Sequence, residues 1–223
     1  MIGRKELKET QRLKPNNMRQ ILNLEKLVTK YEIKIEGVIH IGAHFGEENR
    51  VYNKLGIKNR VFFEPQSSSF EELKRRLGST HLLVNKALGN ERKTVKMFIE
   101  SANKGQSSSI LKPTLHLVQY SNIKFDDIEE VEMIRLDDFG LNMDEFNFIS
   151  IDVQGYELEV FKGASETLKS IDYIVSEINK EELYENGAKI EQLIEFLSPY
   201  GFELVEENWI GGNWGDGLFI KKK

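Results

Sequence analysis

Residues 37–48 read GVIHIGAHFGEE, and the expected fold follows from this stretch. Its first five residues predict a short apolar strand, Gly42 and Gly46 predict a turn, and the residues from Glu47 onward predict a helix along 47–55. A strand that passes through a glycine turn into a helix is how a parallel α/β sheet begins. In such sheets ligands bind at the carboxyl ends of the strands, so this turn is the first place to look for a site.

The alternation of strands and helices continues toward the C-terminus. Further strands are predicted at RVFFE (60–64), HLLVNKAL (81–88), TVKMFI (94–99), VEMIRLDDF (131–139), FNFISIDV (146–153) and IDYIVSEI (171–178). An antiparallel pair is predicted at FELVEEN (202–208) and WGDGLFIK (214–221), and helices at 67–78, 156–169 and 189–198. FNFISIDV is nearly all apolar, as a central strand covered on both faces should be. We therefore expect one open, mostly parallel sheet.

Two segments stand outside this alternation. Residues 1–34 are predicted to form an N-terminal helical arm, and residues 35–223 the main domain. Residues 101–127 contain Ser, Gly and Pro without clear periodicity. Loops of this length are usually functional or mobile, so we expect a long ordered insertion or lid.

Composition limits the kinds of partner. The chain has 223 residues, 39% of them hydrophobic and 30% charged, with a net charge of -5 and no cysteine. These values suit a globular protein with no nucleic-acid partner, and they exclude disulfides, thiol nucleophiles and Cys-ligated zinc. The first thirty residues lack an apolar signal core, and no stretch approaches the length of a membrane span. We expect a cytoplasmic protein with no membrane partner.

Three interpretations of the glycine turn compete. His40 and His44 could pair on a metal, but Gly42 lies between them and His40 belongs to a strand, so helix geometry does not hold the rings together. A dinucleotide fingerprint would need glycine at the positions of His44 and Glu47. A nucleoside ligand without phosphate, such as S-adenosylmethionine, is the third interpretation and the one we favour, because its carboxylate can use amides at a helix N-terminus.

The second predicted strand supports the nucleoside interpretation. RVFFEP places Glu64 at its end, 22 positions beyond Gly42. A carboxylate suits a vicinal diol because its two oxygens can each accept one hydrogen bond from the ribose hydroxyls. Alone, Glu64 could equally be a surface cap, but the glycine turn upstream favours the ribose role.

Several motifs together resemble the FkbM-type family of S-adenosylmethionine-dependent methyltransferases. The matching segments cover roughly residues 37–220 in the expected order and include VIHIGAHFGEE, VFFEP, NKALGN, SSSIL, IRLDDF and, as the most distinctive, FISIDVQGYELEVFKGA. The resemblance implies the class I methyltransferase fold, a Rossmann-like, seven-stranded, mostly parallel sheet with helices on both faces and an antiparallel last strand. It also implies O-methylation, often of sugar or polyketide hydroxyls.

The resemblance further implies a set of cofactor-binding residues. Those expected to line or contact the cofactor are Gly42, Ala43, Gly46, Glu64, Asn85, Lys86, Ala87 and Asp152. The family usually has Asp and Asn at the positions of His40 and His44, which we also place in the cofactor site. A neutral imidazole is a poorer partner for the cofactor's ammonium than a carboxylate is, so backbone carbonyls, water or Asp152 would have to hold that group.

Two carboxylates are candidates for catalysis. Asp152 follows a buried strand and precedes a flexible QG pair, so its side chain should enter the cleft as the base that activates an acceptor hydroxyl. Its alternative role is to cap the following helix. Glu177 ends the next strand and is the second candidate, while Glu157 can pair within its helix or support the site. Asp152 and Glu177 offer oxygen ligands, but no dedicated spacing demands a metal, and we predict none.

Four residues are candidates for contact with the acceptor. Ser108 and Ser109 offer small hydroxyls, although SSSIL can also be a simple turn. His116 lies in the expected lid and Trp214 near the last hairpin, where a ring could stack on a sugar; a surface histidine and a packed core tryptophan are the alternatives.

The sequence thus predicts an S-adenosylmethionine-dependent O-methyltransferase acting on a hydroxyl of a carbohydrate or small metabolite. A non-catalytic binding domain that keeps the methyltransferase fold is the first alternative, and it would bind cofactor without transferring methyl groups, or bind none. A nicotinamide-dependent oxidoreductase is the second, and NAD binding would distinguish it. The acceptor is expected to be a small molecule or glycan.

Overall fold

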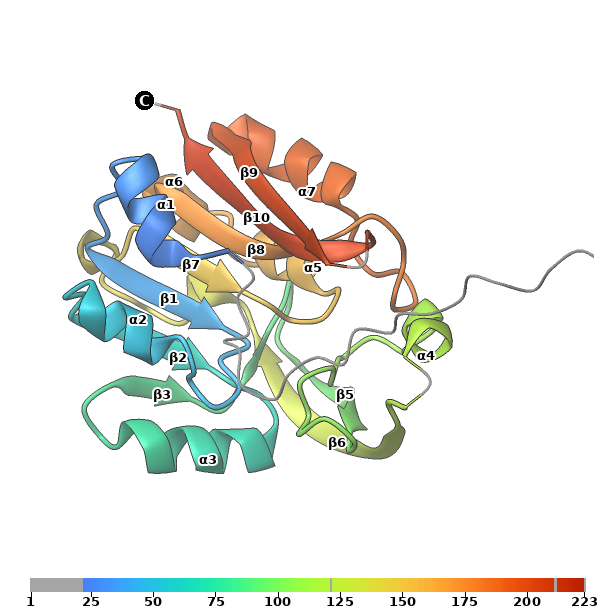
Figure 1. Cartoon of the computed structure of the whole chain (residues 1–223). Coiled ribbons are helices and arrows are strands. Elements are labelled where there is room, and N and C mark those ends of the chain that lie inside the picture. Colours follow the sequence, from blue (N-terminus) through green and yellow to red (C-terminus); the bar gives the residue numbers. More distant parts are fainter. Residues whose placement is uncertain (1–21, 121, 211, 223) are drawn as a thin grey trace, which may run out of the picture.

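A seven-stranded sheet forms the centre of the computed structural model, which describes residues 22–120, 122–210 and 212–222 (Figure 1). Its strand order is β3-β2-β1-β7-β8-β10-β9. All neighbouring pairs are parallel except those of β10, which runs antiparallel to both β8 and β9. The bounds are β1 (Gly37–Ile41), β2 (Asn59–Phe63), β3 (Leu82–Val84), β7 (Phe148–Ile151), β8 (Tyr173–Asn179), β9 (Phe202–Ile210) and β10 (Trp214–Lys221). The predicted class I methyltransferase sheet, with its antiparallel last strand, is confirmed.

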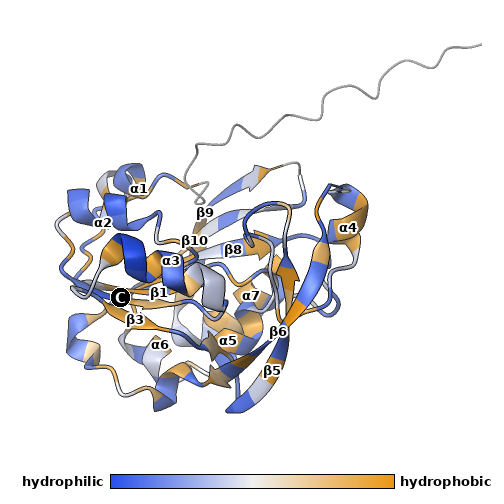
Figure 2. Ribbon diagram, turned by 90° about the horizontal axis from the view of Figure 1, so that it is seen from below, coloured by the Kyte–Doolittle hydropathy of each residue, from blue (hydrophilic) through white to orange (hydrophobic). Residues whose placement is uncertain are grey.

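Helices cover both faces of this sheet because its central strands are apolar on both sides (Figure 1). In β1, Val38 packs with α1 (Leu24–Lys30), α2 (Asn49–Lys54) and α3 (Ser67–Leu77). Its neighbour Ile39 faces the opposite side and packs with α5 (Glu157–Lys162), α6 (Thr167–Ser170) and α7 (Ile190–Leu197). Figure 2 shows that α2 is mostly hydrophilic outside the few residues it turns toward the sheet.

A second sheet of three strands was not predicted. It has the order β4-β6-β5 and consists of β4 (Ala87–Leu88), β5 (Lys93–Glu100) and β6 (Phe125–Ile134). The expected single strand at 81–88 is therefore wrong, because the chain leaves the main sheet after Val84 and enters the small one at Ala87. Asn85 holds this crossing in place, since its Nδ2 donates to the carbonyl oxygens of Glu64 and Pro65, both at 2.9 Å.

The expected insertion at 101–127 is ordered and packs against the main domain. It contains α4 (Leu115–Gln119), and β6 begins inside it at Phe125. The amide of Ser109 donates to the carbonyl of Phe98, and the amide of Thr114 donates to the carbonyl of Leu183. These bonds tie the insertion to β5 of the small sheet on one side and to the loop after β8 on the other.

The predicted helix at 156–169 is two helices. Gly163 ends α5 where the chain passes Gly89, and a Cβ at this position would lie 1.8 Å from the carbonyl oxygen of Gly89. The next helix then starts on an external cap, because Asp137 Oδ1 accepts from the amide of Thr167 at 2.9 Å. The described residues also form three short 3-10 helices at Leu136–Asp138, Met143–Glu145 and Ser198–Tyr200.

The described part of the predicted arm lies against the sheet. Leu24 and Leu27 are buried, and the amide of Leu22 donates to Asp216 Oδ2 on β10 at 3.1 Å. The remainder of the arm, residues 1–21, lies outside the described residues. Among the described residues, no helix is both long enough and apolar enough to cross a membrane.

Candidate active site

A pocket opens where the carboxyl ends of β1, β2 and β7 meet the small sheet. The predicted residues that line it are Gly42, His44, Glu64, Lys86, Ala87, Ser108, Ser109 and Asp152. These eight come from five separate stretches of sequence, and the fold brings them together. Residues that sequence reasoning missed complete the wall: Gln66, Met97, Gly105, Ile110, Val153 and Tyr156 are among them.

Gly42 forms the floor of the pocket. Its φ is +78°, and a Cβ there would lie 1.9 Å from the carbonyl oxygen of Asp152. Its amide donates to the carbonyl of Phe63 at the end of β2. Only glycine permits this backbone to approach β7 so closely, so the turn joins the ends of three strands and leaves a cradle without a side chain.

Glu64 stands beside this cradle and is buried, with 5% of its surface exposed. Its Oε2 accepts from the amide of His44 at 2.7 Å, and its Oε1 accepts from the amide of Gln66 at 2.9 Å. The two amides fix the plane of the carboxylate at the pocket wall. A carboxylate held in this way is suited to accept hydroxyl hydrogens from a ribose.

His44 joins the glycine turn to the insertion. It has a φ of +47°, and its ring stacks on Phe45 with 3.6 Å between the ring centroids. Its Nε2 lies 2.9 Å from the carbonyl oxygen of Lys104, and its Nδ1 lies 3.1 Å from Glu47 Oε1. The neighbouring Gly105 packs on the side chain of Gln66, where a Cβ would be 2.5 Å from Oε1. The insertion therefore closes over the Glu64 side of the pocket.

Asp152 and Glu177 lie at the ends of β7 and β8, and one side chain links them. Gln154 Nε2 donates to Asp152 Oδ1 at 2.7 Å and to Glu177 Oε2 at 2.9 Å. The amide of Gln154 is oriented in turn, because its Oε1 lies 2.9 Å from the hydroxyl of Tyr184. Gln154 has a φ of +56°, next to Gly155 at +96°. The Gln154-Gly155 pair was expected to be flexible, but the side chain of Gln154 links Asp152 to Glu177.

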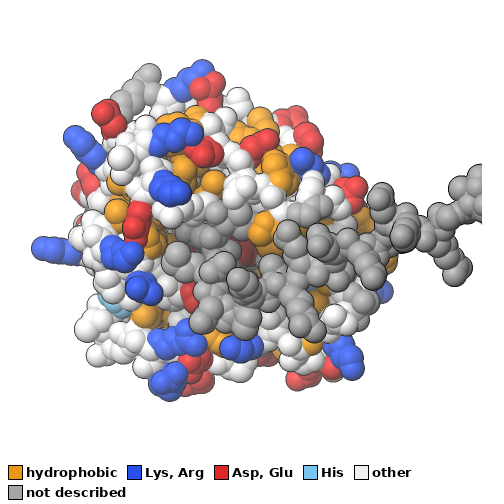
Figure 3. All heavy atoms as spheres, viewed as in Figure 1, with side chains coloured by type: hydrophobic (Ala, Val, Ile, Leu, Met, Phe, Trp, Pro, Cys, Tyr) orange, Lys and Arg blue, Asp and Glu red, His pale blue; other side chains and the backbone are white. Residues whose placement is uncertain are grey.

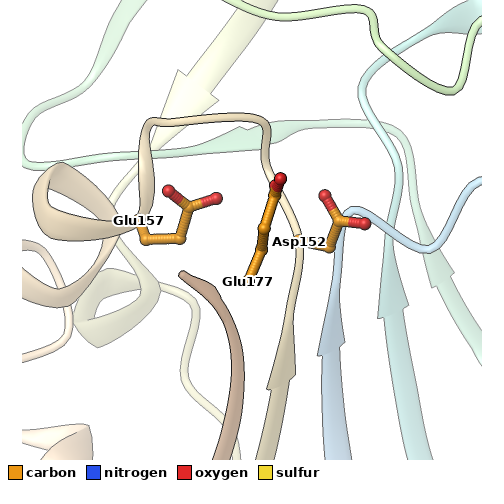
Figure 4. Close-up of side chains that lie close together, drawn as sticks. All are labelled: Asp152, Glu157 and Glu177. Atoms are coloured by element: carbon orange, nitrogen blue, oxygen red, sulfur yellow. The ribbon is translucent and has the colours of Figure 1, made fainter. Parts of the chain in front are cut away.

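Glu157 is the third carboxylate of this group and is fully buried. Its Oε1 accepts from the amides of Val153 at 3.0 Å and Gly155 at 3.2 Å. Burial raises the pKa of Glu157 to about 7, and the charge of Asp152 adds to the rise. One oxygen from each of Glu157, Glu177 and Asp152 lies within 4.8 Å of the other two, and Figure 4 shows the three side chains in a row.

Some predicted cofactor residues lie behind the pocket and do not line it. His40 faces α2, where its Nδ1 lies 3.0 Å from the hydroxyl of Tyr52, because alternation along β1 turns its ring away from Ile41 and the site. Ala43 is buried in the core on the same side. Gly46 packs on α3, and a Cβ there would lie 2.7 Å from Leu73 Cδ1. Asn85 supports the turn after β2, as described above.

Two predicted acceptor residues are also outside the lining of this pocket. His116 is buried among the rings of Tyr120, Phe125 and Tyr184. Trp214 donates from Nε1 to the hydroxyl of Tyr120 at 2.6 Å. Both rings therefore hold α4 against the body of the protein.

Comparison with known families identifies the family to which the chain belongs. A model of the methyltransferase FkbM domain matches residues 40–204, well over half of the chain. The protein belongs to the FkbM methyltransferase family. This FkbM-family chain is also 29% identical over 181 residues to the 2-O-methyltransferase NoeI of Sinorhizobium fredii, a match that covers 76% of this chain and 73% of that protein.

Solved structures agree on the fold of the FkbM-family chain. Magnesium protoporphyrin IX methyltransferase from Synechocystis, crystallised with S-adenosylmethionine, has a TM-score of 0.52 at 9% identity, covering 89% of this chain and 76% of that one. A protein of the NADB-Rossmann superfamily from Streptococcus agalactiae has a TM-score of 0.51 at 12% identity, covering 91% and 69%. At these identities the likeness establishes the class I architecture alone.

Proposed function

We propose that this FkbM-family protein is an S-adenosylmethionine-dependent O-methyltransferase acting on a hydroxyl of a carbohydrate or small metabolite. The observation that carries the proposal is one pocket that combines the Gly42 cradle, the amide-held carboxylate of Glu64 and the carboxylate of Asp152. The first two features suit a nucleoside, and the third supplies a base beside it. The relative named a 2-O-methyltransferase supports a hydroxyl acceptor.

The residues present fit the cofactor. Gly42 brings the turn close to β7, where any Cβ would collide with the carbonyl oxygen of Asp152, and the wall beside it carries Glu64, suited to the ribose hydroxyls, and Ala87 on β4. Met97 and Tyr156 add apolar surface suited to the face of an adenine ring. When bound, S-adenosylmethionine supplies an electrophilic methyl group on a sulfonium.

The chain's own part in the reaction is alignment and proton removal. In the proposed mechanism Asp152 accepts the proton of the acceptor hydroxyl, so that the oxygen becomes nucleophilic. Gln154 orients that carboxylate through its 2.7 Å bond to Oδ1, and Glu177 shares the same amide. The insertion, held by His44 at Lys104, would limit access of water to the site.

A second hollow beside the pocket favours a polar acceptor. Tyr156 lines both cavities. The polar residues around the second hollow are Asn90, Glu91, Lys93, Glu159, Asn186 and Gln192. Amides and mixed charges suit the several hydroxyls of a sugar. On the face shown in Figure 3, Lys and Arg side chains lie among Asp and Glu side chains.

Titration calorimetry with S-adenosylmethionine and S-adenosylhomocysteine tests the cofactor, and mass spectrometry of a panel of sugars and small alcohols tests the transfer. Binding of both ligands together with a mass increase of one methyl group on an acceptor is the expected result. Absence of binding near a millimolar would reject the proposal. Binding without transfer to any acceptor would favour the non-catalytic alternative. The cytoplasmic location and the division between residues 34 and 35 stay predictions.

A further inference from the structure

Gln154 is held in an uncommon backbone conformation beside the proposed base. Its φ of +56° lies in the left-handed region, which residues other than glycine seldom adopt. The hydroxyl of Ser109 donates to the carbonyl oxygen of Gln154 at 2.8 Å. Ser109 is itself anchored to β5, because its amide donates to the carbonyl of Phe98 and its carbonyl accepts from the amide of Phe98. The insertion therefore fixes the main chain of Gln154.

The side-chain amide of Gln154 has one orientation that satisfies its neighbours. Both hydrogens of Nε2 are used, because this atom donates to Asp152 Oδ1 at 2.7 Å and to Glu177 Oε2 at 2.9 Å. The hydroxyl of Tyr184 donates to Oε1 at 2.9 Å. The reversed amide would place Oε1 against two carboxylate oxygens, which offer it no hydrogen to accept. The chemistry of the neighbours thus decides which way the amide points.

Tyr184 is fixed by the insertion through its backbone and its hydroxyl. It forms an isolated β-bridge with Pro113, and only 1% of its surface is exposed. Its hydroxyl lies 2.8 Å from the carbonyl oxygen of Ser107 as well as 2.9 Å from Gln154 Oε1. A tyrosine hydroxyl carries one proton, so these two acceptors share it. The strength of the bond to Gln154 therefore depends on where the insertion places Ser107.

We propose that Tyr184 is a positioning residue: its hydroxyl holds the amide of Gln154 and, through that amide, the carboxylate of Asp152. Hydrogen bonds in a chain polarise one another, so the bond at Oε1 strengthens the two bonds that Nε2 donates. The role in the reaction rests on the proposed methyltransferase function, in which Asp152 has to be aligned with the acceptor hydroxyl. Tyr184 is not among the described residues that line the pocket, so it acts through Gln154.

Nuclear magnetic resonance of the full chain labelled with ¹⁵N-glutamine tests the contact without cofactor or acceptor. The side-chain amide signal of Gln154 is identified by its absence in Gln154→Ala. Tyr184→Phe keeps the ring and removes only the hydroxyl, so we expect these amide hydrogens to exchange with water at least about tenfold faster, as the loss of one hydrogen bond allows. Tyr120→Phe is the matched control, because the Tyr120 hydroxyl accepts from Trp214 and its ring lies beside the same His116. It should leave the exchange unchanged.

Steady-state kinetics tests the role in the reaction. Tyr184→Phe should lower kcat about three- to tenfold, the effect of one lost hydrogen bond, without changing the cofactor Kd measured by calorimetry. Residues that act as a unit have non-additive effects, so Tyr184→Phe should cost no further kcat in the background of Gln154→Ala. Should circular dichroism show that Gln154→Ala does not fold, Gln154→Asn takes its place, because asparagine tolerates a positive φ.

The outcomes separate the role of Tyr184 from the proposed function. Unchanged amide exchange in Tyr184→Phe, or equal exchange in Tyr184→Phe and Tyr120→Phe, overturns the contact. Equal losses of kcat in the wild-type and Gln154→Ala backgrounds indicate a packing defect and overturn the positioning role. Faster exchange in Tyr184→Phe alone, with no methyl transfer to any acceptor, rejects the methyltransferase proposal and leaves the hold of Tyr184 on Gln154 standing. Methyl transfer with unchanged exchange rejects only the role of Tyr184.

Discussion

The carboxylates in the two halves of the site are hydrogen-bonded differently. At the ends of β1 and β2, Glu64 meets two backbone amides, each on its own oxygen. At the ends of β7 and β8, Asp152, Glu157 and Glu177 share one side-chain amide and two backbone amides. One half is a wall held by backbone amides, and the other gathers three carboxylates, with one oxygen of each within 4.8 Å of the other two.

Under the proposed function, this difference assigns ligand binding to the first half and the reaction to the second. A carboxylate fixed by backbone amides changes little during a reaction and serves to position a ligand. Neighbouring carboxylates can accept a proton, because the proton relieves their mutual repulsion. The predictions below test that division, beginning with the largest expected effect.

Gly42→Ala should abolish cofactor binding. The new Cβ would lie 1.9 Å from the carbonyl oxygen of Asp152 and would force the ends of β1 and β7 apart, in addition to the strain of φ +78°. We expect affinity for S-adenosylhomocysteine to fall at least about 100-fold, as a close-approach glycine should require. Gly56→Ala is the matched control: its φ is +71° with nothing within 4 Å of its Cβ, so it carries the strain alone. Equal effects of both substitutions would contradict the cradle.

Asp152→Asn should lower turnover while leaving the cofactor in place. Loss of a general base costs about 100- to 10,000-fold in rate, and an amide cannot accept the proton. Cofactor affinity measured by calorimetry should change little, because the Gly42 cradle and Glu64 remain. The exposed Asp144→Asn is the control for charge. Unchanged turnover in Asp152→Asn would exclude the base and move the chemistry elsewhere.

Glu64→Gln should lower cofactor affinity and leave turnover nearly unchanged, the reverse of Asp152→Asn. One oxygen becomes an NH₂ that points at a donor, either the amide of His44 or that of Gln66. We expect cofactor affinity to fall about 10- to 100-fold, which corresponds to about 1.4–2.8 kcal/mol. Turnover at saturating cofactor should stay close to wild type. Glu71→Gln, on the exposed face of α3, serves as the control. A loss of turnover without a loss of affinity would show that the two halves are not divided as proposed.

His116→Phe should alter only the response of stability to acid. Burial lowers the pKa of His116 from 6.5 to about 4. The unfolded chain therefore binds more protons than the folded one between these values, so stability is complete above pH 6.5 and is lost as pH falls toward 4. At pH 5 the loss amounts to about 2 kcal/mol. Urea unfolding at pH 7.5 and pH 5 should show a smaller difference for the variant. An identical difference in both proteins would mean that His116 does not titrate this way.

Most strands of the main sheet could be predicted from the sequence because the signals for a strand are local. The apolar runs at 37–41 and 148–151 predict buried strands, and glycine turns mark where these strands end. The small sheet escaped prediction because β4 has only two residues and its partner β6 begins inside the insertion. The direction of His40 was set by its register in β1, which turns alternate side chains to opposite faces, and the family pattern could not reveal this.

The sequence by itself determined the class of fold and brought Gly42 and Glu64 forward as one half of the candidate site. A glycine turn and the acidic end of the next strand lie within one βαβ unit, where short connections fix their relation. Only the tertiary structure brings the three carboxylates together. Asp152 and Glu157 are neighbours along the chain, but Glu177 joins them because β8 pairs in parallel with β7 and ends at the same edge. Burial there depends on long-range packing, and it is burial that makes the charges of these three groups costly.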